Sequence, residues 1–325
     1  MTKYTPHQTI ETDKGEMRKV FAAGLTQLAK SDDRIYLMDS DLMASMSTRS
    51  FMEQFPERTI NCGIQEANMM GIAAGLSAMG KIPFTHTFGA FAARRAYDQI
   101  FISCAYAQQN VKIIGSDPGV TAAANGGTHM PFEDIALMRA IPNMTIVEPT
   151  DITMLASLLP QIANAPGCTY IRLCRKVSEA VYPEGSQFKL GEACLLREGA
   201  DVAIIASGYC VHQALIAAEA LATQGISATV IDMHTIAPLD REAIEFAAKC
   251  GAVVVAENHN VNGGLGSAVA EALGELRPTP LVRVGIHNSF GEVGSREQLA
   301  AKFGIDAAGI VAGAKAAVAK KDKAF

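Results

Sequence analysis

The sequence predicts an α/β protein with two domains, each built on a parallel sheet. Short apolar runs rich in β-branched residues alternate with longer segments of helical periodicity. The runs are continuously apolar rather than alternating, which is typical of strands that helices cover on both faces. A chain of 325 residues is also long enough to form two hydrophobic cores.

The expected elements follow this rhythm along the chain. Strands are expected at residues 34–39, 59–62, 82–87, 111–115, 144–148, 168–173, 201–206, 227–233, 252–256 and 281–286. Helices are expected at residues 16–30, 67–78, 94–108, 151–163, 211–224, 240–249, 266–276 and 306–320. Asp151 and Asp240 stand at the starts of two of these helices, where an aspartate side chain can cap the first turn.

One polar segment, residues 176–192, interrupts the rhythm. It contains Pro183 and Gly185, which favour turns and breaks in regular structure. We therefore expect one domain over residues 1–180 and a second, smaller domain over residues 191–325.

The composition excludes several classes of protein. Lys and Arg number 28 against 33 Asp and Glu, a net charge of −5, so a basic surface for nucleic acid is not expected. No apolar run has the length of a membrane span, and the first residues lack the apolar centre of a signal peptide. The seven cysteines are scattered without a CxxC pair, which argues against a disulfide framework or a metal site. A cytoplasmic enzyme or enzyme subunit is the expectation.

Glu66 lies in an otherwise apolar stretch, NCGIQEANMMG at residues 61–71, where a strand runs into a helix. A carboxyl group in such surroundings suits a role in proton transfer. The alternative is that Glu66 only favours the first helical turn through the helix dipole.

Two aromatic and two basic residues share the next segment, HTFGAFAARRAYDQ at residues 86–99. Phe88 and Phe91 are three residues apart, a spacing that suits either one wall of a cleft or ordinary core packing. Arg94 and Arg95 indicate an ion-pair cluster at an interface or a site for an anion.

His129 stands near the end of a long loop of small residues, 115–134, that follows an expected strand. Loops beyond the carboxyl ends of parallel strands are where α/β proteins place ligands, so His129 is a candidate functional residue. Another glycine-rich segment, GGLGSA at residues 263–268, does not complete a GxGxxG motif. A tight turn into a helix explains it equally well, and no nicotinamide site is predicted.

Together these segments resemble transketolase, specifically its C-terminal half. The resemblance extends over nearly the whole chain, and its most specific stretches are GIQEANM (63–69), TFGAFAARRAYDQI (87–100), GGTHM with PFEDIALMRAIPNM (126–144) and ENHNVNGGLGSAVAEAL (257–273). The family implies a doubly wound thiamine diphosphate pyrimidine-binding domain followed by a smaller transketolase C-terminal domain.

The resemblance also implies a missing half. The chain contains no GDG motif, through which this superfamily holds the cofactor's diphosphate and Mg²⁺. It is therefore similar to the second subunit of a split transketolase, active only with an N-terminal-half transketolase subunit as its partner, in a heterotetramer. The implied reaction moves a two-carbon ketol unit from a ketose phosphate to an aldose.

Residue roles follow from the same resemblance. Glu66 matches the glutamate that hydrogen-bonds the aminopyrimidine ring and so activates thiamine diphosphate. Phe88 and Phe91 match the aromatic cradle of that ring, and Asp41 and Leu42 match positions beside the cofactor.

For the sugar, His129 matches a catalytic histidine that contacts the donor. Arg18, Ser45 and Arg175 match positions that bind the phosphate, for which the guanidinium fork is well suited.

Three residues depart from the family pattern. Asn125 stands where an aspartate usually reads sugar hydroxyls, Asp117 stands where a histidine usually lies near the phosphate, and Arg94 stands where many members have a tyrosine near the cofactor. Because a carboxylate repels a phosphate, these departures indicate an unusual donor or acceptor. Either the phosphate lies closer to Arg18 and Arg175, or one substrate lacks it.

Two other functions stay open. A 1-deoxyxylulose-5-phosphate synthase-like enzyme or the beta subunit of a 2-oxo acid dehydrogenase would share this half-architecture, although the TFGAF and GGTHM segments favour transketolase. A non-catalytic regulatory subunit would keep the fold without the chemistry. The joint presence of Glu66, Phe88, Phe91 and His129 argues against that interpretation.

Overall fold

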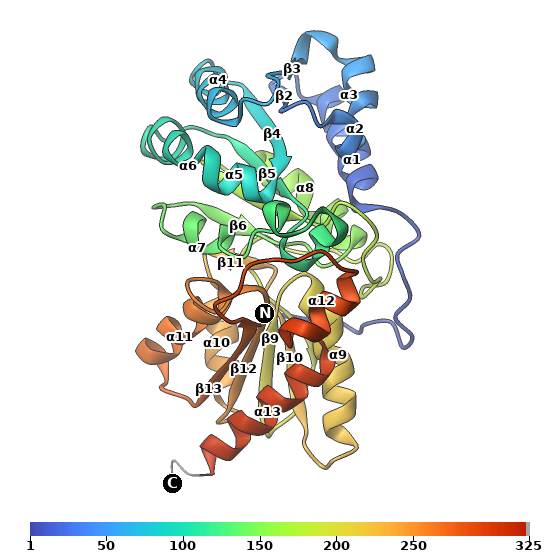
Figure 1. The fold of residues 1–325 in the computed structure, drawn as a ribbon, viewed down its shortest axis with the longest axis vertical. Helices are drawn as coiled ribbons and strands as arrows, with labels where there is room; N and C mark the ends of the chain where they lie inside the picture. Colours follow the sequence, from blue (N-terminus) through green and yellow to red (C-terminus); the bar gives the residue numbers. More distant parts are fainter. Residues whose placement is uncertain (323–325) are drawn as a thin grey trace.

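Two sheets, each covered by helices on both faces, organise residues 1–322, the part of the chain that the computed structural model describes. Figure 1 shows the two domains stacked along the long axis, the first in blue to green and the second in yellow to red. Within the described residues, no helix combines the length and the apolar character that a bilayer crossing requires.

The first sheet has seven strands in the order β11-β6-β7-β5-β4-β2-β3. These strands are β2 (Ile35–Asp39), β3 (Thr59–Asn61), β4 (Ile82–Phe88), β5 (Lys112–Ser116), β6 (Thr145–Val147), β7 (Thr169–Leu173) and β11 (Thr235–Ala237). All neighbours are parallel except β11, which is antiparallel to β6. The carboxyl ends of β2, β4, β5 and β7 therefore meet at one edge, together with the segments that follow them.

Helices cover both faces of this sheet. They are α1 (Met17–Ser31), α2 (Met43–Met46), α3 (Arg49–Gln54), α4 (Glu66–Ala78), α5 (Gly89–Arg95), α6 (Tyr97–Gln99), α7 (Asp134–Arg139) and α8 (Ile152–Asn164), with the 3₁₀ turns η1 (Pro56–Arg58), η3 (Gly119–Asn125) and η4 (Gly127–His129) and the π-helix η2 (Ile100–Tyr106). Successive strand residues enter different cores. Leu37 and Ile114 pack with α1 and α8, whereas Met38 and Ile113 pack with α4 and α5. This two-sided burial explains why the strands are continuously apolar.

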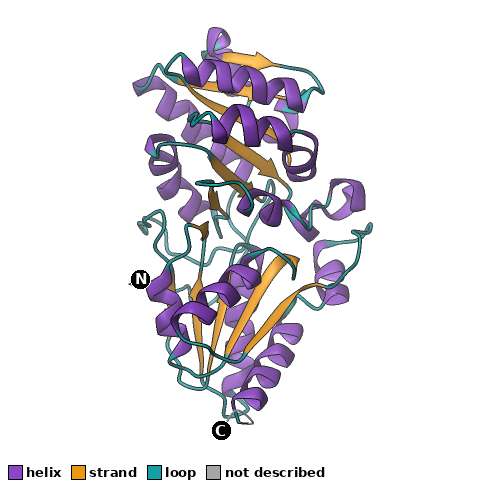
Figure 2. Cartoon of the chain, turned by 90° about the vertical axis from the view of Figure 1, so that its left-hand side faces the viewer, coloured by secondary structure: helices purple, strands orange, loops and turns teal. Residues whose placement is uncertain are grey.

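The second sheet has six strands in the order β1-β8-β10-β9-β12-β13, and Figure 2 shows helices on both of its sides. The strands are β1 (Thr2–Lys3), β8 (Cys194–Arg197), β9 (Val202–Ala206), β10 (Ala228–Asp232), β12 (Val253–Asn260) and β13 (Leu281–Ile286). The helices are α9 (Tyr209–Ala222), α10 (Arg241–Ala248), α11 (Leu265–Leu276), α12 (Arg296–Phe303) and α13 (Ala307–Lys321).

The structure confirms the alternating pattern. Each of the ten expected strands is present, and Asp151 and Asp240 cap α8 and α10 by accepting the N–H groups of Met154 and Ala243. The short β1, β8 and β11 and the helices α2, α3 and α12 were not expected. They are brief, and tertiary contacts rather than local sequence define them.

Three expectations were wrong. The sheets are not purely parallel, because β8 and β11 run antiparallel to their neighbours β10 and β6. Residues 94–108 do not form one helix: α5 ends at Arg95, and the short α6 and then the π-helix η2 follow. Its buried Ile100 and Cys104, four residues apart, fit an α or a π turn equally well. Finally, β1 pairs with β8, so the start of the chain belongs to the second sheet and not to the first domain.

A buried cation joins the two domains. Arg172, in β7, is completely buried, and its guanidinium donates to Asp134 (Nε to Oδ2, 2.9 Å) and Glu148 (Nη1 to Oε1, 2.7 Å). Its third nitrogen donates to the backbone oxygen of Asn258 in β12, at 2.7 Å. Burial opposes the ionisation of Asp134, but the charge of Arg172 outweighs it and lowers the pKa of that carboxyl.

A buried carboxyl makes a second connection. Asp232, the last residue of β10, accepts hydrogen bonds from the hydroxyl groups of Thr150 (2.6 Å) and Tyr182 (2.7 Å). Burial raises the pKa of Asp232 from 3.8 to about 7. Between these two values the folded state binds more protons than the unfolded state, so the contribution of Asp232 to stability decreases as the pH rises.

We expect Arg172→Met to lower the free energy of unfolding by about 3–5 kcal/mol, because it leaves the carboxylates of Asp134 and Glu148 buried without their cation. Urea unfolding followed by circular dichroism measures the change. Arg277→Met, at an exposed position, should change it by less than about 0.5 kcal/mol. Equal effects of the two substitutions would contradict the assignment of Arg172 as the interdomain cation.

We expect Asp232→Asn to alter the pH dependence of stability. Asparagine keeps an acceptor for Thr150 and Tyr182 but cannot ionise. The stability of the wild type relative to this variant should therefore fall as the pH is raised from about 4 to about 7. Urea midpoints of both proteins across this range measure the difference, and a constant difference would show that Asp232 does not titrate there.

Candidate active site

Glu66 begins α4 and is 4% exposed. Its Oε1 accepts hydrogen bonds from Arg95 (Nη1, 3.1 Å) in α5 and Thr87 (Oγ1, 3.4 Å) in β4. Both of these partners lie outside α4. A role confined to the first helical turn is therefore insufficient, because the carboxylate is directed at the end of β4.

Three aromatic rings meet next to this carboxylate. Phe88 is the last residue of β4, Phe91 lies in α5, and His129 ends η4. The ring centroids are 6.0 Å apart for the two phenylalanines, and His129 lies 5.2 Å from Phe88 and 5.0 Å from Phe91, all edge to face. Phe88 is buried, but Phe91 and His129 are partly exposed, so these rings form a wall and not only core packing.

The wall borders an open hollow of about 700 Å³. It is lined by Ala90, Phe91, Arg94, Arg95, Gly127, Thr128, His129, Phe290 and Gly291. The last two follow β13, so the second domain contributes to the hollow. A side chain at Gly127 would overlap the backbone oxygen of Gly291, which explains why glycine is needed where the domains approach.

Both arginines of α5 form ion pairs within the chain. The guanidinium of Arg95 lies over the ring of Phe91 at 4.0 Å and pairs with Glu66. Arg94 lies 3.3 Å from the carboxylate of Glu133 and donates to the backbone of Thr128. The expected ion-pair cluster is therefore present, but it lies in the site.

The residues predicted to bind the phosphate, Arg18, Ser45 and Arg175, come together. The backbone N–H of Arg18 donates to the carbonyl of Arg175 at 3.1 Å, and the Arg18 guanidinium donates to the Ser45 carbonyl at 2.8 Å. Asp117 joins them, with Oδ2 2.8 Å from Nη2 of Arg175. We call these four residues the terminal-anion group. It adjoins the aromatic wall, because the guanidinium of Arg175 lies 5.1 Å from the centre of Phe88.

Three other predicted residues lie at the edges. Asp41 and Leu42 follow β2, the strand next to β4, and Asp41 bonds to Asn61 (N to Oδ1, 3.1 Å) with a left-handed backbone, φ 63°. Asn125 ends η3 and is exposed, four residues before His129. None of the three is within the aromatic wall itself.

A buried series of hydrogen bonds joins the strand ends next to the site. His86 in β4 contacts Asp39 (Nδ1 to Oδ2, 3.0 Å) and Ser116 (Nε2 to Oγ, 3.1 Å). The spacing is that of a catalytic triad, but all three residues are completely buried, so no substrate reaches the serine hydroxyl. Asp39 also accepts the N–H of Leu42, so this series of hydrogen bonds connects the ends of β2, β4 and β5. Nothing in the sequence marks His86, because a single histidine in an apolar run carries no sign of its partners.

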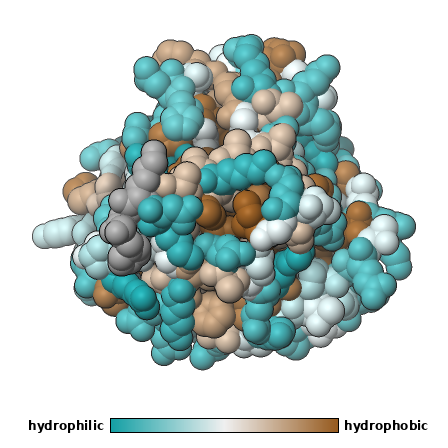
Figure 3. Space-filling model, turned by 90° about the horizontal axis from the view of Figure 1, so that it is seen from below, coloured by the Kyte–Doolittle hydropathy of each residue, from teal (hydrophilic) through white to brown (hydrophobic). Residues whose placement is uncertain are grey.

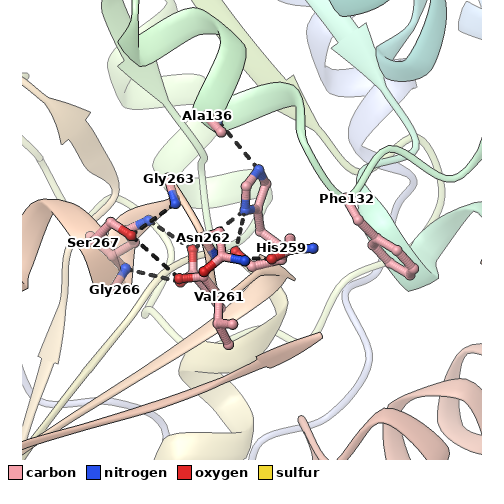
Figure 4. A network of polar contacts seen from close by, with 12 residues as sticks. Phe132, Ala136, His259, Val261, Asn262, Gly263, Gly266 and Ser267 are labelled. Carbon is pink, nitrogen blue, oxygen red and sulfur yellow. Dashed lines mark hydrogen bonds and ion pairs between the residues drawn. The ribbon is translucent and has the colours of Figure 1, made fainter. Parts of the chain in front are cut away.

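The glycine-rich turn before α11 belongs to the domain interface. Glu257 occupies the start of this helix, accepting the N–H groups of Leu265 (2.7 Å) and Gly266 (2.9 Å). Figure 4 shows His259 pointing from β12 to Ala136 in α7; its Nε2 accepts the Ala136 N–H at 3.3 Å, and its Nδ1 contacts the Asn260 carbonyl at 2.7 Å. Burial lowers the pKa of His259 to about 4, so the imidazole is neutral. A tight turn that packs two domains explains this segment.

The donor sets of a metal or disulfide site do not occur in residues 1–322. No group of three His, Cys, Asp or Glu side chains there is arranged to hold a metal ion. The seven cysteines are unpaired, and burial raises the pKa of Cys104 to about 12.

Two family models match the chain. They describe the transketolase pyrimidine binding domain, over residues 13–179, and the transketolase C-terminal domain, over residues 191–310. The chain belongs to the transketolase family.

Similar proteins define its place in that family. The chain is 51% identical to the 6-deoxy-6-sulfo-D-fructose transketolase subunit of Clostridium sp. (strain MSTE9), over 96% of this chain and 98% of the relative. It is 37% identical to one of the subunits of the apulose-4-phosphate transketolase of Phocaeicola vulgatus, over 90% and 94% of the two chains.

Solved structures of transketolases are similar to this chain as well. A split gene transketolase, described as an inactive beta4 tetramer, has a TM-score of 0.86 at 41% identity and covers 94% of this chain and 99% of its own. The transketolase of Campylobacter jejuni has a TM-score of 0.78 at 25% identity over 92% of this chain, but only 46% of that longer chain is matched. The protein is one of the two kinds of chain that make up a split transketolase.

Proposed function

We propose that this chain is the pyrimidine-binding subunit of a thiamine diphosphate-dependent transketolase that takes a two-carbon ketol unit from a ketose with an unusual anionic end. One observation carries the proposal. Phe91 and His129 line one hollow at the carboxyl edge of the first sheet, and Phe88 packs against both of their rings. Glu66, from a separate part of the sequence, pairs with Arg95, whose guanidinium lies over Phe91. A regulatory subunit would have no use for a buried carboxylate beside an open aromatic wall.

The residues fit the cofactor that transketolases generally use. The flat guanidinium of Arg95 lies on the face of Phe91 and pairs with Glu66. The same face can therefore stack against a flat pyrimidine ring. Thiamine diphosphate would supply the carbon nucleophile that receives the two-carbon unit. Glu66 would hold a proton at a ring nitrogen, and His129 would orient the donor sugar. We assign the diphosphate and Mg²⁺ to the partner chain.

A partner surface is available near α4. Ile64, Met79, Ile102 and Tyr106, which are at least half exposed, lie beside or on α4 and the adjoining η2. By contrast, Figure 3 shows a mainly polar face at the second-domain end, with its apolar areas separated. We propose that the N-terminal-half partner binds on the α4 side, next to the hollow, in a heterotetramer of two copies of each chain.

The substrate proposal rests on the relatives and on the departures from the family pattern. One relative is named for a sulfonated ketose, and another is named for the phosphate of a branched sugar. We take 6-deoxy-6-sulfofructose as the first donor to test, because that relative is 51% identical over nearly the full length of both chains. We assign Asp117 to the anionic end of the substrate and Asn125 to its hydroxyl groups.

The decisive experiment is an assay with thiamine diphosphate and Mg²⁺, using this chain alone and co-purified with the partner that holds the diphosphate half. Donors are 6-deoxy-6-sulfofructose, fructose 6-phosphate and an uncharged four-carbon ketose. We expect two-carbon transfer only when both chains are present. Glu66→Gln should lower kcat at least about 100-fold, the usual contribution of acid–base catalysis. The exposed Glu53→Gln should leave it unchanged.

The other functions predict different results. Turnover of pyruvate or another 2-oxo acid, with no ketose accepted, would indicate the synthase or dehydrogenase class. No turnover of any substrate by a stable complex that binds thiamine diphosphate would indicate a regulatory subunit.

Arg95 must leave Glu66 and Phe91 before a pyrimidine ring can take its place. We therefore expect Arg95→Met to tighten thiamine diphosphate binding to the complex about five-fold, because the exposed ion pair and the cation–π contact no longer compete. Isothermal titration calorimetry measures the affinity. Arg241→Met, which removes an exposed ion pair with Glu275, should have no effect. Unchanged or weaker binding by Arg95→Met would show that Arg95 does not compete.

A further inference from the structure

We infer that Asp117 makes the terminal-anion group selective for a singly charged substrate end, such as a sulfonate, over a phosphate dianion. The inference rests on the proposed function and names the residue that determines its specificity. It is carried by the charge arrangement around Arg18 and Arg175, which the sequence alone does not reveal.

Each cation of the terminal-anion group already has an acidic partner. The carboxylate of Asp117 lies 2.8 Å from Nη2 of Arg175, and both side chains are largely buried, at 3% and 12% exposure. The guanidinium of Arg18 forms hydrogen bonds of 2.9–3.1 Å to Glu16. Arg175 and Asp117 therefore form a buried pair without net charge, whereas Glu16, outside the group, is shared between Arg18 and the exposed Lys19.

The position of Asp117 is fixed by the fold. Its backbone is left-handed, with φ 57°, directly after β5, and its N–H donates to Leu173 in the adjoining β7 at 3.0 Å. Arg175 follows β7 two residues later. The ion pair thus spans two neighbouring strand ends, so Asp117 cannot move away without breaking the sheet edge. Burial raises the pKa of Asp117, and the charge of Arg175 opposes this change.

The group also keeps a free donor. Nε of Arg175 is buried and has no hydrogen-bond partner among residues 1–322. Oδ2 of Asp117 also has no hydrogen-bond partner there, so its 2.8 Å contact with Nη2 is an ion pair without hydrogen-bond geometry, and both atoms keep bonding capacity that a ligand would use. The same guanidinium borders Phe88, which places this donor within reach of the far end of a sugar lying along the aromatic wall.

Charge then decides between the two kinds of ligand. A phosphate monoester carries about −1.5 to −2 charges at pH 7, whereas a sulfonate carries a single charge on three oxygens. The cost of removing an ion from water rises steeply with its charge. A group with net positive charge repays the higher cost of the dianion, but a compensated one does not. Both ligands offer three acceptor oxygens, so hydrogen-bonding capacity does not separate them.

The test compares substrates in the complete complex with thiamine diphosphate and Mg²⁺. We expect the wild type to favour 6-deoxy-6-sulfofructose over fructose 6-phosphate in kcat/KM. Asp117→His, which restores the residue usual in the family, should lower this preference at least ten-fold, chiefly through KM for the phosphate. Asp117→Asn should shift it in the same direction. The exposed Asp33→Asn is the matched control and should leave it unchanged.

A second measurement needs no variant. Methanesulfonate and methyl phosphate, as competitive inhibitors of the wild type, report the same selectivity, and methanesulfonate should inhibit at the lower concentration. Equal loss of both charged substrates in Asp117→Asn would overturn the inference, because it would mean that Asp117 binds a sugar hydroxyl. Stronger inhibition by methyl phosphate would overturn it as well. Failure to use even the uncharged ketose would instead overturn the proposed function.

Discussion

The buried guanidinium of Arg172 is the interaction on which the arrangement of the two domains depends. It satisfies two carboxylates of the first domain and binds the backbone of Asn258 in the second. The Asn258 side chain then accepts the N–H of Val120 and donates to the carbonyl of Pro118, both at 2.9 Å. These bonds hold the segment that leads through η3 to His129. A residue that faces the hollow is thus positioned by a cation that the substrate never reaches.

Charge compensation is the second theme of the site. Arg18, Arg94, Arg95 and Arg175 each contact a carboxylate of the same chain. An anion or a flat ring that enters therefore has to share or displace an existing pair. Such pairs contribute little where they are exposed, as for Arg95, and are costly to break where they are buried, as for Arg175. The exposed pair suits exchange with a ligand, whereas the buried one suits discrimination.

Much of the fold and part of the candidate site could be predicted from the sequence, because the patterns that indicate them are local. Continuous apolar runs indicated the long strands, Asp151 and Asp240 indicated helix starts, and the loop after β5 indicated His129. What could not be predicted depends on partners distant in the sequence. Nothing in the segment around His86 shows that Asp39 and Ser116 will flank it, and the run that contains Arg172 looks like any buried strand. The pairing of Asp117 with Arg175 likewise needed the register of β5 on β7.

The edge strand of the first sheet, β11, comes from the second domain. β11 pairs antiparallel with β6 and covers its free edge. If the chain were cut in the segment between the domains, Thr145–Val147 would become an open edge of unpaired backbone groups. Such edges recruit strands from other molecules, so an excised first domain would be prone to aggregate even with its own core intact. For protein engineering, the two domains form one inseparable module, and a chimaera with another family member should exchange them together.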